Sequence, residues 1–288
     1  MRNCLLLFFL FFFSIECPAQ TIYTQKDVDV CNSKFQFSSE KNLSSLPINE
    51  IIIEIGKSFL GTDYVANSLE KGEEEKLVIN LTGLDCYTFL ENSLVFARSI
   101  KKRKTSPKDR SEFEDFQREL INIRYRNGKI EEYPSRLHYF SDWIYDMNKR
   151  GIGKDITKEI GGKPYIKKIN FMSTHIDAYW QLKSNPKFVD EMVKIEEKIS
   201  SRNYFYIPQK DISSIEDKIH SGDIIGITTN VEGLDIAHTG IAIRMDDGRI
   251  HLMHAPNVGY KVQINEKPLA DYIKGNKKQT GIMVLRAI

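Results

Sequence analysis

The sequence predicts an α+β fold in which helices come first and an antiparallel sheet comes last. Apolar residues recur at helical spacing as far as Ile199, and at every second position after it. The chain has 288 residues, of which 41% are hydrophobic, and this is enough to bury one large core. Together these observations favour a helical region packed on a sheet.

Helices are expected over four segments, namely 48–60, 86–97, 133–148 and 185–199. Ser135 is the expected N-cap of the third helix, and Pro186 stands in the first turn of the fourth. Glycines mark residues 151–162 as a loop between them.

Strands are expected over five segments, namely 206–208, 223–228, 236–245, 249–253 and 281–286. The turn Asp246-Asp247-Gly248 joins two of these segments into a hairpin.

The N-terminus has the pattern of a secretory signal peptide. Arg2 precedes a short apolar block, residues 4–15, and cleavage is expected after Ala19. We expect the protein to be exported and periplasmic, without an integral membrane segment once the signal is removed. The expected organisation is a signal peptide over 1–19, an N-terminal extension over 20–47 and one domain over 48–288, with a helical insertion at about 99–200.

The charge pattern does not point to nucleic acid. The formal net charge is +2. Lys101, Lys102, Arg103 and Lys104 form a basic run that continues with Lys108 and Arg110. Acidic residues follow it closely, so a solvated loop is expected there.

Cys31 and Cys86 are the cysteines left after signal removal, too few for a disulfide scaffold. Cys86 lies on an apolar helical stripe, which favours core packing. Either Thr82 or Asp85 as N-cap, however, would place it in the first turn, where the helix dipole lowers a thiol pKa and favours a nucleophile. Cys31 should be free or paired between chains, since a bond to Cys86 would silence that thiol.

A general base for such a thiol could come from the hairpin "AHTGIAIRMDDGRIHLMHAP", which carries His238, His251 and His254. His238 shares a face with Gly240, where open space could admit a thiol. If Gly240 opposes His254, the two histidines are diagonal neighbours on one face, and a one-residue slip separates them. A zinc site is the other possibility, but His251 and His254 alternate to opposite faces.

The ordered blocks "GTDYVANSLE", "LDCYTFLE", "SGDIIGI" and "AHTGIAIR…HLMHAP" resemble the NlpC/P60 superfamily of papain-like cysteine peptidases. The stretch "RYRNGKIEEYPSRLHYFSDWI" resembles in particular the DUF1460 branch of cell-wall amidases, related to N-acetylmuramoyl-L-alanine amidases. The resemblance covers residues 48–286. Many NlpC/P60 enzymes have Asp-Cys-Ser-Gly at the nucleophile, whereas this chain has Asp-Cys-Tyr-Thr, in agreement with the amidase branch.

The resemblance implies a papain-like fold, with the nucleophile helix packed on an antiparallel sheet, and a set of roles. Cys86 would be the nucleophile, His238 the general base and His254 the residue that orients it. Tyr64 would donate to the oxyanion. Asp85 would be a helix cap or a substrate ligand, and neither a metal nor another cofactor is implied.

One segment of the insertion is a candidate for substrate binding, and its residues are Arg136, Tyr139, Ser141, Asp142 and Trp143. They could form a wall of the cleft, with Arg136 on a stem-peptide carboxylate and an aromatic ring on the sugar. Alternatively, Trp143 packs beneath its helix while Arg136 and Asp142 are solvated.

The sequence therefore predicts a cysteine amidase that acts on peptidoglycan or muropeptides. By resemblance, the bond cut joins N-acetylmuramic acid to L-alanine. The alternatives are a γ-D-glutamyl-diamino acid endopeptidase of the same fold and a non-catalytic peptidoglycan-binding module. We expect His238 to face Cys86 and His254 to lie on the far side of His238.

Overall fold

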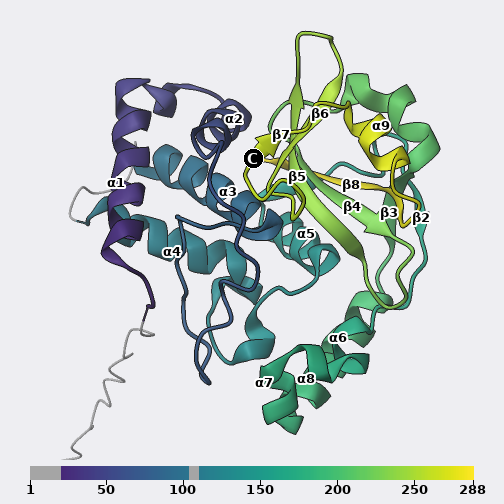
Figure 1. Cartoon of the computed structure of the whole chain (residues 1–288). Coiled ribbons are helices and arrows are strands. Elements are labelled where there is room, and N and C mark those ends of the chain that lie inside the picture. Colours follow the sequence, from purple (N-terminus) through teal and green to yellow (C-terminus); the bar gives the residue numbers. More distant parts are fainter. Residues whose placement is uncertain (1–20, 104–109) are drawn as a thin grey trace, which may run out of the picture.

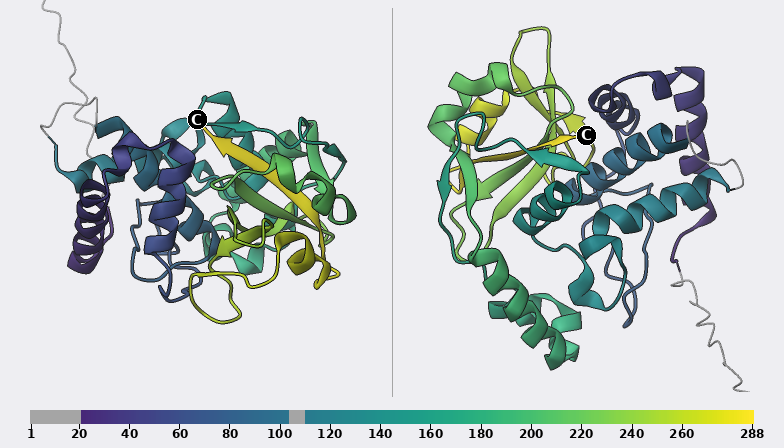
Figure 2. Two further views of the ribbon diagram at one scale, coloured as in Figure 1. Left: turned by 90° about the horizontal axis from the view of Figure 1, so that it is seen from above. Right: turned by 180° about the vertical axis from the view of Figure 1, so that it is seen from behind.

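A computed structural model describes residues 21–103 and 110–288, and it shows a helical layer packed against one large sheet (Figure 1). Helices α1 to α4 lie on one side of the sheet, and α9 covers the other side (Figure 1). Helices α6, α7 and α8 project from the rest of the molecule, as the view from behind also shows (Figure 2). The predicted signal peptide lies outside the described residues.

The described α-helices have these bounds: α1 Gln25–Glu40, α2 Ile48–Ser58, α3 Cys86–Arg103, α4 Glu112–Arg124, α5 Phe140–Lys149, α6 Phe171–Thr174, α7 Trp180–Ser184, α8 Pro186–Ser200 and α9 Leu269–Lys274. Two of them confirm sequence expectations closely. The predicted 48–60 helix is α2, and the predicted 185–199 helix is α8, whose N-cap Asn185 accepts from the Lys187 N–H.

The strands are β1 Gly153–Asp155, β2 Lys163–Tyr165, β3 Tyr204–Pro208, β4 Ile224–Thr229, β5 Ile236–Arg244, β6 Ile250–His254, β7 Gln263–Ile264 and β8 Gln279–Ala287. They form one antiparallel sheet in the order β2-β3-β8-β4-β5-β6-β7, with β1 added to β8. The α+β class and the five predicted strands are confirmed. The three strands that were not predicted have only two or three residues each, too short for a period of two to be visible.

The two faces of the sheet bury different cores. Ile241 and Met253 point to the face covered by α2 and α3. Ala242 and Leu252, one position along each strand, belong to a second core on the α9 side. This alternation follows from the strand period of two and fixes which face each histidine of the hairpin occupies.

The N-terminal extension is part of the main core. Cys31 and Phe35 of α1 are buried in the same cluster as α2 and α3. Thr24 caps α1, and Asp27 accepts a 2.8 Å hydrogen bond from the Leu81 N–H. Cys31 is a free cysteine at 0% exposure, and burial raises the pKa of its thiol. Of the two expectations for Cys31, the free thiol agrees with the structure.

The predicted helix over 133–148 is wrong in its first half. Tyr133–Ser135 forms a 3-10 turn, Arg136 and Tyr139 are extended, and α5 begins only at Phe140 without a side-chain cap. Tertiary contacts outweigh the helical pattern here, because extended Arg136 forms a bridge to Tyr125. The predicted loop 151–162 likewise contains β1.

The basic run is not a solvated loop over its described part. Lys101, Lys102 and Arg103 form the last turn of α3. Lys102 bonds Glu119 and Arg103 bonds Asp115, two of the acidic residues that follow in the sequence. Lys104 and Lys108 lie outside the described residues. Across 21–103 and 110–288, no helix is both long and apolar enough to cross a membrane.

Candidate active site

Cys86 is the first residue of α3, and Asp85 caps the helix. The Asp85 carboxylate accepts from the Thr88 N–H at 2.7 Å and from the Thr88 hydroxyl at 2.8 Å, and that hydroxyl accepts from the Asp85 N–H at 2.9 Å. Of the two predicted N-caps, Asp85 is therefore the one used. The cap anchors the residue directly before the thiol and leaves Cys86 partly exposed at the helix N-terminus.

The hairpin brings His238 and His254 together on one face of the sheet. The pairs Ile241↔Met253 and Ala242↔Leu252 set a register in which Gly240 opposes His254. The two rings then meet, with His238 Nε2 and His254 Nδ1 2.6 Å apart. The predicted register is confirmed.

His251 points away from this pair. Its Nδ1 lies 2.9 Å from the Asn265 carbonyl and its Nε2 lies 3.0 Å from Asp247. Both ring nitrogens of His251 are therefore occupied on the other face of the hairpin.

The space above Gly240 is not the open approach that the sequence suggested. A Cβ at Gly240 would lie 2.8 Å from Leu252 Cδ1 and 2.7 Å from the Met253 carbonyl oxygen. Leu252 fills this space because it lies on the same face, in the core that α9 covers. A thiol therefore has to approach His238 from elsewhere.

Cys86 meets β5 beside the histidine rather than above it. The Thr239 backbone N–H lies close enough to the thiol to affect its pKa, and Thr239 directly follows His238. The β4–β5 register shifts between the pairs Ile227↔His238 and Thr228↔Ile236, which marks a bulge at Ala237. A bulge bends its strand and redirects neighbouring side chains, so it sets the aim of His238.

Burial dominates the electrostatics of this group. Desolvation, and then the Asp85 carboxylate, raise the pKa of the Cys86 thiol to about 12, while the N–H groups of Thr239, Cys86 and Tyr87 act in the opposite direction. Burial lowers the pKa of His238 to about 4, and burial with His238 alongside lowers that of His254 to about 3. The thiol and both imidazoles are neutral at pH 7. The expected low thiol pKa is wrong, because desolvation outweighs the helix N-terminus.

Tyr64 lies close enough to Cys86 to sense its charge. Burial, then Cys86 and Asp85, raise the pKa of the Tyr64 phenol. Its segment is held by backbone bonds, since the Tyr64 N–H donates to the Tyr260 carbonyl at 2.7 Å and Asp63 forms a bridge with Gly83, just before the nucleophile helix. Tyr64, Asp85, Cys86, His238 and His254 are thus brought into one region.

The Arg136 guanidinium is already paired with two carboxylates of this chain. Its guanidinium binds Glu75 through Nε at 2.9 Å and Nη2 at 2.7 Å, and Glu70 through Nη1 at 2.6 Å. Arg136 is 7% exposed, and Glu75 raises its pKa further despite burial. The expectation that Arg136 awaits a stem-peptide carboxylate is corrected by this arrangement.

The other four insertion candidates also face inward. Trp143 is fully buried and donates to the Ile123 carbonyl, and the Tyr139 hydroxyl donates to Glu196 at 2.7 Å. Asp142 is paired with Arg126 at 2.9 Å and Arg202 at 2.6 Å. The Ser141 N–H donates to Asp235 at 2.7 Å. None of these four forms the predicted cleft wall, because all four are buried inside the fold, where Tyr139, Asp142 and Trp143 have polar partners.

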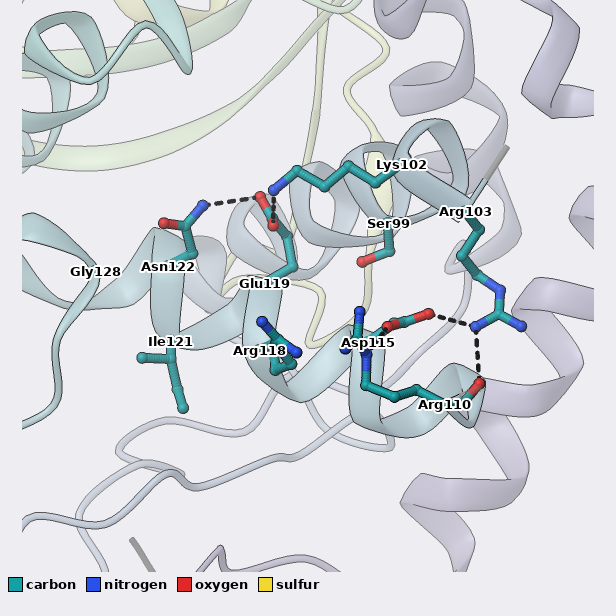
Figure 3. Close-up of a pocket in the computed structure, with 10 residues that line it drawn as sticks. All are labelled: Ser99, Lys102, Arg103, Arg110, Asp115, Arg118, Glu119, Ile121, Asn122 and Gly128. Atoms are coloured by element: carbon teal, nitrogen blue, oxygen red, sulfur yellow. Dashed lines mark hydrogen bonds and ion pairs between the residues drawn. The ribbon is translucent and has the colours of Figure 1, made fainter. Parts of the chain in front are cut away.

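A hollow between α3 and α4 lies at the opposite end of α3 from Cys86 (Figure 3). Glu119 binds Lys102, Arg98 and Asn122, and Asp115 binds Arg103 and Arg110. Both acidic residues are thus paired with basic residues of α3, and Asp115 also with Arg110 just before α4, so we assign the hollow to the scaffold.

Sequence reasoning missed Tyr272 of α9, whose ring meets the His254 ring in a T-shaped arrangement, with centroids 5.4 Å apart and planes at 79°. The Gln279 side chain hydrogen-bonds its hydroxyl, which lowers the pKa of Tyr272 against the larger effect of burial. Nothing in the local pattern around "LADYIK" signals this contact, because α9 follows the hairpin and folds back over it.

Comparison with known proteins supports the predicted amidase branch. The chain matches the family model described as AmiA-like, N-acetylmuramoyl-L-alanine amidase-like, over residues 54–282. No curated relative matches the chain. A crystal structure of an N-acetylmuramoyl-L-alanine amidase from Bacteroides uniformis ATCC 8492 is 37% identical with a TM-score of 0.77, covering 84% of this chain and 99% of that one.

Two further solved structures are similar. A Bacteroides fragilis protein, provisionally described as a xylanase, is 37% identical with a TM-score of 0.72, covering 81% of this chain and 99% of that one. Protein LPG0564 from Legionella pneumophila, assigned to DUF1460, is 23% identical with a TM-score of 0.66, covering 92% and 95%, and shows a shared fold. Because the family model spans most of the chain and includes Cys86, His238 and His254, the protein belongs to the N-acetylmuramoyl-L-alanine amidase-like family.

Proposed function

We propose that this protein is an exported cysteine amidase that hydrolyses the bond between N-acetylmuramic acid and L-alanine in peptidoglycan fragments. The observation that carries the proposal is the 2.6 Å contact between His238 Nε2 and His254 Nδ1. His238 directly precedes Thr239, whose backbone N–H lies close to the Cys86 thiol. With Nε2 engaged by His254, Nδ1 of His238 is the nitrogen left to exchange a proton with the thiol.

The reaction would proceed in two halves. Cys86 Sγ attacks the lactyl carbonyl carbon while its proton moves to His238, and the tetrahedral intermediate collapses as His238 passes that proton to the departing L-alanine nitrogen. Water then attacks the thioester carbon, giving its proton to His238. His238 returns this proton to the Cys86 sulfur as the muramic acid carboxyl group leaves, and that carboxyl group then loses its remaining proton to water.

The pKa directions favour transfer of the proton during attack over a thiolate formed beforehand. Burial raises the pKa of Cys86 and lowers that of His238, so a resting ion pair is disfavoured. The activity would depend on neutral His238 as general base. It should fall as pH drops toward the His238 pKa of about 4.

The oxyanion would lie between the backbone N–H of Cys86 and the Tyr64 hydroxyl. Burial and the nearby Cys86 keep this phenol protonated, and therefore a donor. A donor of this kind contributes about 3 kcal/mol to lowering the barrier. Asp85 has the role of helix cap, since its Oδ1 accepts from the backbone N–H and the hydroxyl of Thr88.

The wider assignment is part of the same proposal. A thiol at a helix N-terminus beside a histidine on an antiparallel strand agrees with the papain-like NlpC/P60 arrangement. Residues 1–19 would direct export, which places the enzyme in the same compartment as its substrate. The γ-D-glutamyl-diamino acid endopeptidase and the wall-binding module are the two alternative functions, and the experiment below distinguishes them from the amidase.

Mass spectrometry of a disaccharide-tetrapeptide digest tests the proposal. We expect free disaccharide and an intact stem peptide beginning at L-alanine, formed equally well with a chelator present. A dipeptide left on the sugar would identify the endopeptidase instead. Unchanged substrate, bound but not cut, would identify the binding module, and loss of turnover with chelator would identify a metal-dependent hydrolase.

A further inference from the structure

One buried nitrogen in the catalytic group has no polar partner. His254 is 1% exposed, its Nδ1 meets His238, and its Nε2 has no hydrogen-bond partner among the described residues. A buried polar atom without a partner is rare and costs stability, so its surroundings require an explanation.

Tyr272 supplies a different kind of neighbour. Its ring contacts the His254 ring in a T-shaped geometry, and Gln279 of β8 holds its hydroxyl. Gln279 is itself buried, and its backbone carbonyl accepts from the Gln209 side chain at 3.1 Å. The Tyr272 ring is therefore fixed from two sides, by its helix and by β8.

The contact between the two histidines needs one donor and one acceptor, and only one arrangement leaves a base for Cys86. If His254 carries its proton on Nε2, Nδ1 accepts from His238 Nε2–H, and His238 Nδ1 keeps a lone pair. If His254 carries its proton on Nδ1, the bond reverses and His238 Nδ1 is protonated, so it cannot accept the thiol proton.

We propose that the Nε2 edge of His254 faces the ring of Tyr272, and that Tyr272 is thereby a positioning residue that selects the Nε2–H tautomer of His254 and keeps His238 Nδ1 available as the base. An N–H edge is attracted to the negative face of an aromatic ring, whereas a nitrogen lone pair is repelled by it. The inference rests on the proposed cysteine mechanism for its consequence, but the tautomer itself can be observed without any turnover.

Three titratable groups bear on His254, and they come from three elements. His238 faces it from β5, Tyr272 faces it from α9, and Cys86 of α3 lies near enough to act on Tyr272. At pH 7 all three are neutral, because burial raises the pKa of Cys86 and Tyr272 and lowers that of His238. The tautomer is thus decided by dipoles and ring contacts, with no ionised group among the three.

Nitrogen NMR of the full chain with ¹⁵N-labelled histidine, recorded at pH 7, is the test. We expect His254 to show Nε2 protonated and Nδ1 as an acceptor, and His238 to show a free Nδ1. A wild-type spectrum with Nδ1 of His254 protonated overturns the proposal without any variant being needed.

Two substitutions of Tyr272 make the test specific. Tyr272→Phe keeps the ring and should keep both the tautomer and kcat, whereas Tyr272→Leu removes the ring and should raise the Nδ1–H population of His254. Because a wrong histidine tautomer is severe for catalysis, kcat of Tyr272→Leu should fall by about tenfold or more with KM unchanged. An unchanged His254 spectrum in folded Tyr272→Leu protein overturns the proposal. A changed spectrum in a protein without amidase activity supports it and refutes the proposed function instead.

Discussion

Two buried polar groups of this protein, one around Cys86 and one around Arg136, are built on opposite electrostatic principles. Around Arg136, Arg124 and Asp142, the buried charges meet opposite charges at 2.6 to 2.9 Å. Around Cys86, the thiol and the two imidazoles are neutral, and His254 Nε2 has no hydrogen-bond partner among the described residues. Paired charges hold the insertion in one shape, whereas a neutral thiol and a neutral imidazole can exchange a proton. Burial of polar groups alone therefore does not identify a catalytic site.

The largest effect should come from removing the thiol. Cys86→Ala should lower turnover by at least about 10⁴-fold while muropeptide binding stays nearly unchanged, because the thiol acts in the transition state. Kinetics and calorimetric binding on the same preparation measure both. The matched control is Cys31→Ser, which changes the other free thiol and should leave the specific activity of folded protein intact. Equal losses in the two variants would contradict the assignment of Cys86.

Removing the ion pairs of Arg136 should lower the free energy of unfolding and leave kcat nearly unchanged. Arg136→Met leaves Glu75 buried and unpaired, and we expect a loss of roughly 3 to 5 kcal/mol in the free energy of unfolding. Urea unfolding measures this, and kcat of the folded fraction should stay near the wild-type value.

Lys187→Met is the matched control for Arg136. Its ion pair with Glu132 is exposed on both sides, and we expect a change within about 0.5 kcal/mol. If Arg136→Met instead raised KM strongly without lowering stability, Arg136 would belong to the substrate site after all.

His254 should matter less than Cys86, because it orients a base and does not itself carry the proton. We expect His254→Ala to lower kcat by roughly 10- to 100-fold. His251→Ala removes a ring of the same hairpin that faces the other way, bonded to Asn265 and Asp247, and should leave kcat unchanged. Similar kcat losses in both variants would point to general damage of the hairpin.

The smallest effect should appear in the dependence of stability on pH. The folded-state pKa values of His238 and His254, about 4 and about 3, lie below the ordinary value of 6.5. Acid therefore favours the unfolded chain. The contribution of these two histidines to the free energy of unfolding is fully present above pH 6.5, and it is lost as pH falls toward 4 and then 3.

Urea unfolding between pH 7 and 5 measures this loss. Glu91 acts in the opposite sense, since burial raises its pKa, so the slope of wild type must be compared with that of His254→Gln. We expect a shallower loss in the variant. An identical slope would show that His254 is not held neutral by burial.

Local patterns in the sequence determined much of the fold and the membership of the catalytic group. The spacing of apolar residues located α2, α8 and five of the strands, because each depends on residues a few positions apart. Asp85 was identified as a candidate cap, since capping is also local. The period of two and the turn at Gly248 predict that His238 and His254 share one face, provided that Gly240 opposes His254.

Tertiary structure decided the partners, the burial and the pKa values of those residues. The sequence indicates a substrate ligand at Arg136 because its actual partners, Glu70 and Glu75, are more than sixty residues away along the chain. Tyr272 reaches His254 only because α9 folds back over the hairpin. The thiol pKa was misjudged for the same reason. The helix N-terminus is visible in sequence, whereas the desolvation that outweighs it depends on every element packed around Cys86. Short-range geometry can thus be predicted from neighbours along the chain, but partners and burial are properties of the packed whole.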